Sequence, residues 1–266
     1  MIRNFFFAVP ALALPLAAQA HTAWLLPSAT VLPAKAWVTV DAGISSDAFI
    51  ANHNPLRLDG LVITAPDGSL AQPENALTGK FRSTFDVNLA LPGTYRMTVI
   101  NSGLNASYEV NGERKRWRGK AENLAKEIPA DAAKLEVGET LGRVETFVTD
   151  GPKNVEALKP VGKGLELVPV THPTDLFVGE TATFRLLLDG APAAQQKLSV
   201  VRGGMRYRNQ QNEIEATTDA SGAFSITWPE TGPWLLSASA SDDKVSAKPA
   251  TQRRLTYTAS FEVLPQ

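Results

Sequence analysis

Residues 80–100 read KFRSTFDVNLALPGTYRMTVI, two runs of alternating apolar and polar residues on either side of a Pro-Gly turn. The first run divides its side chains between two faces, Phe81, Phe85, Val87 and Leu89 on one and Lys80, Arg82, Asp86 and Asn88 on the other. Alternation with a period of two residues predicts a half-buried β-strand. Residues 94–100 predict the antiparallel return strand. The phrase LPGTYRMTV at 91–99 is typical of the last-but-one strand of immunoglobulin-like domains.

Short runs of this kind, ended by Gly, Pro, Asn or Asp, recur along most of the chain. The clearest are residues 37–40, 61–64, 181–188, 197–201, 223–226, 232–238 and 256–263. They predict an all-β chain of two immunoglobulin-like β-sandwich domains in tandem. Residues 111–128 are instead rich in charge and helical in pattern, so they predict a short helical or irregular insertion in the first domain.

The first twenty residues have the features of an export signal. Arg3 precedes an apolar stretch from Phe5 to Leu16, and Ala18-Gln19-Ala20 forms a peptidase site. The apolar stretch is shorter than the roughly 20 residues of a membrane-spanning helix, and we expect no such span in the mature chain. The sequence therefore predicts an exported protein whose mature form begins at His21.

The domain boundaries follow from composition. Residues 1–20 are the predicted signal peptide, and residues 21–149 the first sandwich domain. Residues 150–164 are rich in Pro, Gly and Lys without periodicity, which predicts a linker. Residues 165–266 then form the second sandwich domain, with about the hundred residues that such a domain needs.

Charge and motif content narrow the classes of function. The 26 basic and 27 acidic residues nearly balance, which argues against a nucleic-acid partner. The basic residues around Trp117 could bind an anion, but a solvated loop is the interpretation we favour. No nucleophile-elbow, zinc-protease, Walker or dinucleotide-binding motif is present, so the sequence favours a non-enzymatic role and leaves catalysis open.

The three histidines are the candidate metal ligands, namely His21, His53 and His172. A terminal histidine offers an α-amine, with a pKa of about 8, beside its imidazole, and the two can chelate one ion. In the absence of cysteine, such nitrogen ligands suit Ni, Co or Cu. His53 lies in a turn-rich segment of the first domain and is the preferred second ligand. His172 stands at the start of the second domain, and the choice between the two stays open.

Other residues could complete such a site. Trp24, three residues after His21, could wall it against water. Asp41 and Asp47 could add oxygen ligands, although exposed loop acids are the default interpretation. Met205 is a conceivable soft ligand for copper, without a second methionine to support it.

Several phrases also carry a family resemblance: HTAWLLPS at 21–28, VGETATFRLLLDGAP at 178–192, TTDASGAFSITWPETGPWLLSAS at 217–239 and LTYTASFEV at 255–263. Together they resemble an uncharacterised bacterial exported family, domain of unknown function 4198. Its members are often labelled periplasmic components of nickel or cobalt uptake systems. The resemblance implies two β-sandwich domains, a periplasmic location and a role with a divalent metal.

These observations predict a periplasmic protein that binds a divalent transition metal through its mature N-terminal histidine and serves capture or delivery to an uptake system. Its partners would be the metal ion and a membrane transporter or outer-membrane receptor. One alternative is a non-catalytic adhesion or scaffold module for an envelope receptor or transporter. Another is a copper oxidase that acts on polysaccharide and uses the same terminal histidine in a histidine brace.

Overall fold

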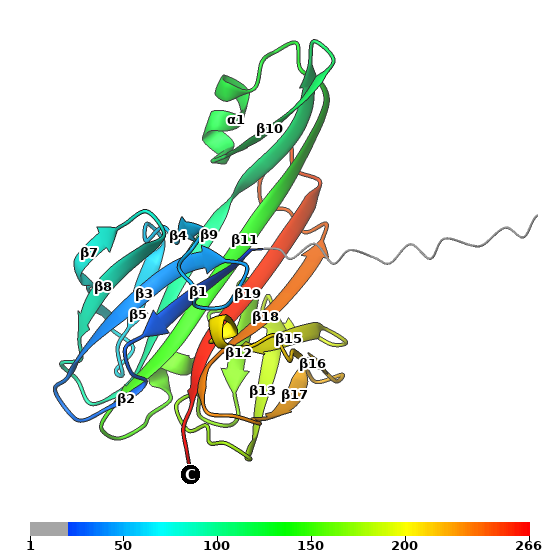
Figure 1. Cartoon of the computed structure of the whole chain (residues 1–266). Coiled ribbons are helices and arrows are strands. Elements are labelled where there is room, and N and C mark those ends of the chain that lie inside the picture. Colours follow the sequence, from blue (N-terminus) through cyan, green and yellow to red (C-terminus); the bar gives the residue numbers. More distant parts are fainter. Residues whose placement is uncertain (1–20) are drawn as a thin grey trace, which may run out of the picture.

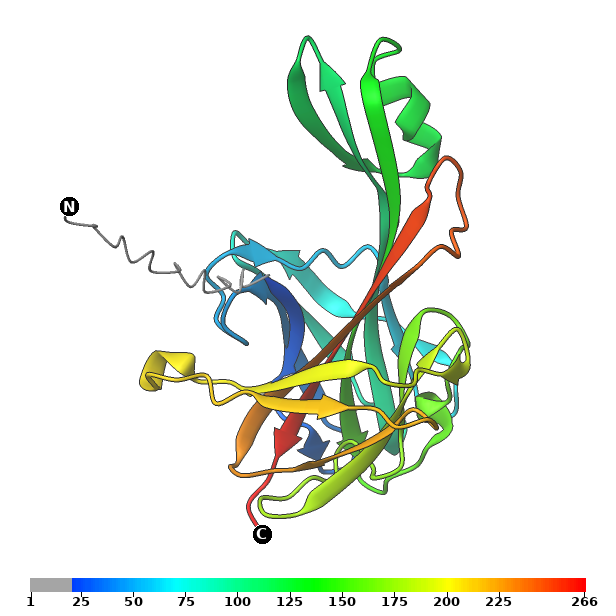
Figure 2. The ribbon, with the colours of Figure 1, turned by 90° about the vertical axis from the view of Figure 1, so that its right-hand side faces the viewer.

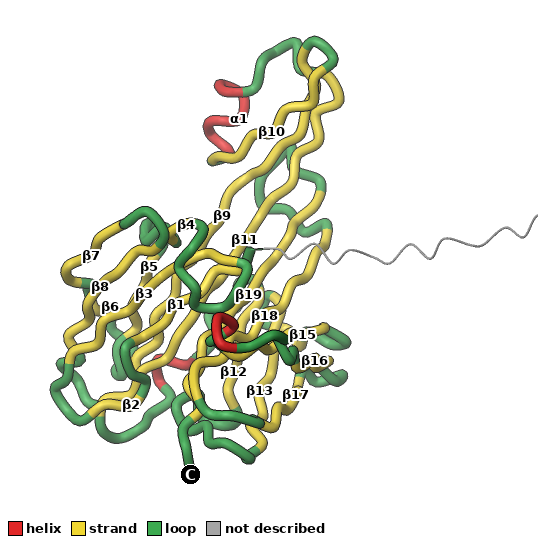
Figure 3. The backbone as a smooth tube through the Cα atoms, in the orientation of Figure 1, coloured by secondary structure: helices red, strands yellow, loops and turns green. Residues whose placement is uncertain are grey.

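The computed structural model describes residues 21–266, and Figure 1 shows their arrangement. The predicted signal peptide lies outside the described residues. The prediction of an all-β chain is confirmed. Helix is confined in the described part to α1 (Ala121–Glu127) and the single turns η1 (Glu156–Leu158) and η2 (Met205–Tyr207), as Figure 3 shows. Over residues 21–266, no helix has the length and apolar content needed to cross a membrane.

Residues 21–266 form three sheets. The five-stranded sheet contains β1 (Thr22–Pro27), β3 (Trp37–Ser45), β4 (Asn54–Pro55), β7 (Glu74–Thr78) and β8 (Arg82–Asn88). The ten-stranded sheet contains β2 (Val31–Leu32), β5 (Leu61–Thr64), β6 (Leu70–Ala71), β9 (Gly93–Val110), β10 (Glu113–Gly119), β11 (Ala133–Asp150), β15 (Lys197–Arg202), β16 (Ile214–Thr217), β18 (Gly232–Asp242) and β19 (Gln252–Val263). The four-stranded sheet contains β12 (Leu165–Pro169), β13 (Thr181–Leu188), β14 (Ala191–Pro192) and β17 (Ala223–Thr227).

The ten-stranded sheet is a middle layer shared by two sandwiches. Successive side chains of a strand point to opposite faces, so β11 contributes side chains to the cores on both sides of the sheet. Val144 and Val148 belong to the core beneath the five-stranded sheet, whereas Phe147 belongs to the core beneath the four-stranded sheet. The two outer sheets therefore cover opposite faces of the middle layer.

The first sandwich contains the two strands from which the fold was predicted, but they do not pair: β8 lies in the five-stranded sheet and β9 in the ten-stranded sheet, so they face each other across the core. Tyr95, Met97 and Val99 of β9 pack against Phe85 and Val87 of β8, and all five side chains are buried. The Tyr95 hydroxyl accepts a hydrogen bond from the Leu91 amide at 2.8 Å and donates one to the Leu91 carbonyl at 3.0 Å. This return to the backbone a few residues upstream is the tyrosine corner of immunoglobulin-like sandwiches.

Two details of that prediction were wrong. Phe81 precedes β8 and is 43% exposed, because the chain turns at residues 79–82 before the strand begins. The predicted return strand exists as β9, but it pairs with β11, β10 and β5 and not with β8, because residues 89–92 carry the chain from one sheet to the other. Strand β9 is buried on both faces between Gly93 and Val99, and its alternate face carries the polar side chains of Arg96 and Thr98.

The second sandwich has an aromatic core of Phe184, Phe224, Trp228, Trp234 and Phe261. The Trp228 and Trp234 rings meet edge to face with centroids 5.6 Å apart. Each module thus buries its own apolar set beneath its own outer sheet, as an independent sandwich would.

The modules are also joined through the middle sheet. Strand β11 pairs in parallel with β19, from Gly138 opposite Gln252 to Thr146 opposite Ser260. Within residues 150–164, the predicted linker, Leu158 belongs to the second core and Ala157 is 1% exposed, whereas most of the other residues are exposed. The division into domains at this segment stays a prediction.

An arm built from the long strands β9 and β11, together with β10 and α1, rises from the sandwiches (Figures 1 and 2). Asn111 and Gly112 both have positive φ, as the two central residues of a tight type I′ hairpin require. The predicted insertion is therefore a hairpin followed by a short helix. Its basic segment at 113–119 is a strand, and helix begins only at Ala121.

Candidate functional site

The structure brings two of the three predicted ligands together. The rings of His21 and His53 are stacked, with centroids 3.7 Å apart and planes inclined by 8°. Strand β3 creates this contact, because Thr22 of β1 pairs with Ser45 and Asn54 of β4 pairs with Ile44. The histidines thus precede two strands that flank the same end of β3, and their side chains meet there.

The ring nitrogens of this pair are free. His21 and His53 are both exposed, and neither ring has a hydrogen bond or ion pair with any residue in the range 21–266. An imidazole nitrogen binds a metal only through an unshared electron pair. Both rings can therefore offer a ligand without breaking a hydrogen bond or an ion pair of the described chain.

Buried side chains, with Trp24 at their centre, pack beneath the loop that carries His53. Trp24 is 1% exposed, and its indole N–H donates to the Ser45 hydroxyl at 2.8 Å. That hydroxyl donates in turn to the Asp47 carbonyl at 2.7 Å. The Phe49 ring meets Trp24 edge to face at 5.8 Å, and a side chain on Gly43 would collide with the indole. Trp24 thus lies beneath the loop, which it positions by packing.

The loop after β15 also reaches this region. Gly203 lies so close to Phe49 that a Cβ there would stand 2.8 Å from its ring. The guanidinium of Arg208 braces the same loop by donating to the carbonyl oxygens of Arg202 at 2.6 Å and Gly203 at 3.1 Å. The second sandwich therefore borders the loop of His53. No local pattern in the sequence predicts this contact.

The other suggested ligands are less well placed. Asp41 forms an exposed ion pair with Arg82 at 3.2 Å. Met205 is half-buried in η2. Within residues 21–266, no group of three or more His, Cys, Asp or Glu side chains is arranged to hold a metal. A metal site at the histidine pair would therefore need a donor that is not one of these side chains.

His172 occupies a different environment. Its Nε2 lies 3.1 Å from the Asn154 carbonyl and 3.1 Å from the Thr94 hydroxyl. Its Nδ1 accepts from the Thr174 amide at 3.3 Å, so the proton of the neutral ring belongs on Nε2, where the Asn154 carbonyl can accept it. Burial lowers the pKa of His172, and the cation Lys153 adds to this effect. Both nitrogens are engaged within the protein, and neither is free for a metal.

The fold and the site together define an all-β protein of two sandwiches with an exposed imidazole pair beside the start of β1. The chain belongs to the family described as Domain of unknown function (DUF4198), which it matches over residues 18–242. No curated protein is a significant match.

Solved structures with some likeness include the D0-D1 domain of intimin, with 13% identity, a TM-score of 0.22, and coverage of 89% of this chain and 96% of that one. The Yersinia pseudotuberculosis adhesin InvE has 14% identity, a TM-score of 0.23 and coverage of 91% and 60%. Trypsin-activated alpha-2-macroglobulin from Escherichia coli has 12% identity, a TM-score of 0.24 and coverage of 93% and 16%. Similarity at this level carries no functional argument.

Proposed function

We propose that the mature protein binds a divalent transition metal in the periplasm through His21 and His53 and passes it to an uptake system. The stacked ring pair is the observation that carries the proposal, because it brings two imidazoles that are far apart in sequence to one exposed point beside the start of the mature chain. Periplasmic location rests on the export signal predicted for residues 1–20 and on the family resemblance.

The ligand set would be three nitrogens. Two come from the imidazoles, and the third is the α-amine of His21, which becomes available only when the bond to Ala20 is cut. Nitrogens about 2.0–2.1 Å from one ion must lie within about 4 Å of each other, so the set requires side chains that already lie side by side, as these two rings do. Parallel rings point their lone pairs side by side, so one ring must rotate for both to face the ion.

Exposure suits capture and release better than permanent retention. Both histidines are solvent-accessible, and a three-nitrogen set leaves a coordination position open to an acceptor. Imidazole and amine donors fit Ni, Co and Cu, and affinity should rise in the order Co, Ni, Cu. The choice among these ions in the cell depends on their supply.

The test compares four forms of the protein in titrations with Cu(II), Ni(II) and Co(II). These are the mature chain, the same chain with one alanine added before His21, His21→Ala and His53→Ala. Mass spectrometry first establishes each N-terminus. We expect the added alanine to weaken binding as much as His21→Ala does, because it converts the amine into a peptide nitrogen. Binding should also weaken as the pH falls, since protons compete for the same nitrogens.

His172→Gln is the matched control, because that histidine is held within the protein and should not affect affinity. Equal affinity of the mature and alanine-extended forms would overturn the terminal chelate. Failure of every form to bind any of the three ions would favour the scaffold alternative.

One observation favours the copper oxidase as a second candidate. Tyr207 is 85% exposed and lies on the braced loop that contacts Phe49, so an aromatic ring projects near the loop of His53. Exposed aromatic rings of this kind pack well against sugar rings. Copper-dependent cleavage of a polysaccharide, lost in His21→Ala and weakened in Tyr207→Ala, would support this activity over delivery.

A further inference from the structure

Strand β10 is an exposed edge of the arm. Its seven residues pair with β9 along one side, from Glu113 opposite Val110 to Gly119 opposite Leu104. Among the described residues, no strand pairs with its other side. An edge of this kind presents unpaired backbone N–H and C=O groups, onto which another extended chain can add.

The edge is strongly basic. Four of its seven residues are cations, namely Arg114, Lys115, Arg116 and Arg118, against the single carboxylate of Glu113. Arg114 has an exposed ion pair with Glu136 at 3.4 Å. The other three cations are exposed and have no ion pair with any residue of the described chain. Because side chains alternate along a strand, both faces of the edge carry unpaired positive charge.

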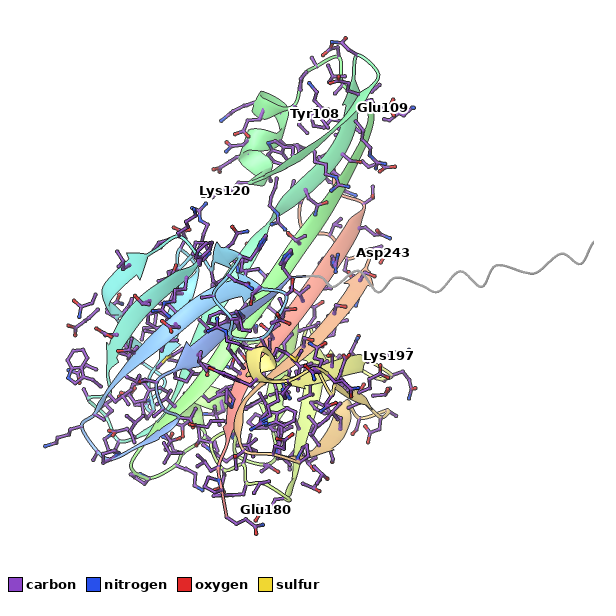
Figure 4. All side chains as sticks on the ribbon, in the orientation of Figure 1. Tyr108, Glu109, Lys120, Glu180, Lys197 and Asp243 are labelled. Carbon is purple, nitrogen blue, oxygen red and sulfur yellow. The ribbon has the colours of Figure 1, made fainter. Side chains whose placement is uncertain are left out.

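The arm holds this edge rigidly. Tyr108 of β9, Leu124 of α1 and Val137 of β11 form part of a small core inside the arm. Figure 4 shows Tyr108 on the side of α1 and Glu109 on the opposite side, as alternation requires. The Trp117 indole donates to Glu127 of α1 at 2.7 Å, which ties β10 to the helix. Because the arm stands away from the sandwiches, the edge is open to a partner (Figure 2).

We propose that the outer edge of β10 binds an extended acidic segment of another protein by strand addition. Backbone hydrogen bonds to β10 would supply affinity, and carboxylates opposite Arg116 and Arg118, which share one face of the strand, would supply selectivity. The same cations repel a second copy of β10, which protects the edge from self-association. A nucleic acid would match the charge but has no peptide groups to continue the sheet.

The proposal is tested with a fluorescein-labelled nine-residue peptide that alternates glutamate with valine, whose binding to the full-length mature protein is followed by anisotropy. Two further peptides carry the same side chains with N-methyl groups on alternate backbone nitrogens. One is methylated at its odd-numbered residues and the other at its even-numbered residues. Because the N–H groups of alternate residues point to the same side of a strand, one of these two peptides lacks the N–H groups that face β10. We expect that peptide to bind at least tenfold more weakly than the unmodified one, whereas the other methylated peptide should retain most of the affinity.

Protein variants test the charge contribution. Because each exposed ion pair weakens binding only a few-fold when it is lost, Arg116→Gln combined with Arg118→Gln should weaken binding about fivefold. The matched control replaces Lys197 and Arg206 by glutamine, since both are exposed cations outside the arm without an ion pair in the described chain. We expect this control to bind like the unaltered protein.

Three results would overturn the proposal. The first is equal binding of all three peptides, which indicates attraction by charge alone. The second is absence of peptide binding at low salt. The third is tighter binding of a single-stranded oligonucleotide of equal charge, which identifies the edge as a nucleic-acid surface.

Discussion

Replacing Glu166 by leucine should remove the contact that holds residues 161–163 against the middle sheet. The Glu166 carboxylate accepts hydrogen bonds from the backbone N–H groups of Val161 at 2.8 Å, Gly162 at 2.6 Å and Lys163 at 3.1 Å. It also faces the Arg143 guanidinium at 3.6 Å, and both side chains are more than nine-tenths buried. Leucine can accept none of these bonds, so it leaves the three backbone N–H groups and the buried Arg143 guanidinium without this acceptor.

The expected cost follows from these contacts. Removing one partner of a buried ion pair costs about 3–5 kcal/mol, because the remaining charge stays desolvated. Arg143 keeps a second partner in Glu145 at 3.2 Å and donates to the Lys163 carbonyl at 3.2 Å, which limits its share of the loss. The three amides add about 1 kcal/mol, the low end of the 1–3 kcal/mol cost of an unsatisfied buried group, because the exposed residues 161–163 can turn toward water. We therefore expect Glu166→Leu to lower the free energy of unfolding by about 4 kcal/mol.

Urea unfolding followed by tryptophan fluorescence measures this change. Glu166→Gln should lose about half as much, because the amide oxygen still accepts hydrogen bonds although the charge is gone. Glu180→Gln serves as the control, because Glu180 is exposed and should change stability by less than about 0.5 kcal/mol. A loss below about 1 kcal/mol in Glu166→Leu would refute the claim that this carboxylate organises the segment.

Three further predictions concern the fold. Burial lowers the pKa of His172, so as the pH falls this histidine takes up a proton in the unfolded chain before it does so in the folded protein. Its contribution to stability is therefore complete above the unfolded pKa of about 6.5 and is lost as the pH falls toward the lower pKa of the folded state. Stability curves from pH 8 to 5 should show this loss in the unaltered protein, and an equal loss in His172→Gln would contradict the assignment. Tyr95→Phe should cost about 2 kcal/mol in urea, because both Leu91 backbone groups lose their partner; an unchanged midpoint would contradict this. Residues 165–266 expressed alone should show a cooperative thermal transition, because they contain their own aromatic core, and a featureless melt would argue against an independent domain.

Local pattern accounts for much of what could be predicted. Alternation determined that residues 82–88 form a strand with Phe85 and Val87 inward, because in an extended chain neighbouring side chains must point to opposite faces. The Asn111-Gly112 pair carried a hairpin signal that a focus on the charges of the following segment missed. The basic strand β10 was therefore mistaken for part of a helical or irregular insertion.

The candidate site depends on more than local pattern. The sequence determined that three imidazoles exist and that His21 would follow a peptidase site, since these are properties of residue type and short motifs. Only the tertiary structure decided that His21 stacks on His53 while His172 is enclosed by hydrogen bonds. That outcome depends on which strands pair with β3 and in which register, and such long-range pairing is set by the packing of whole sheets.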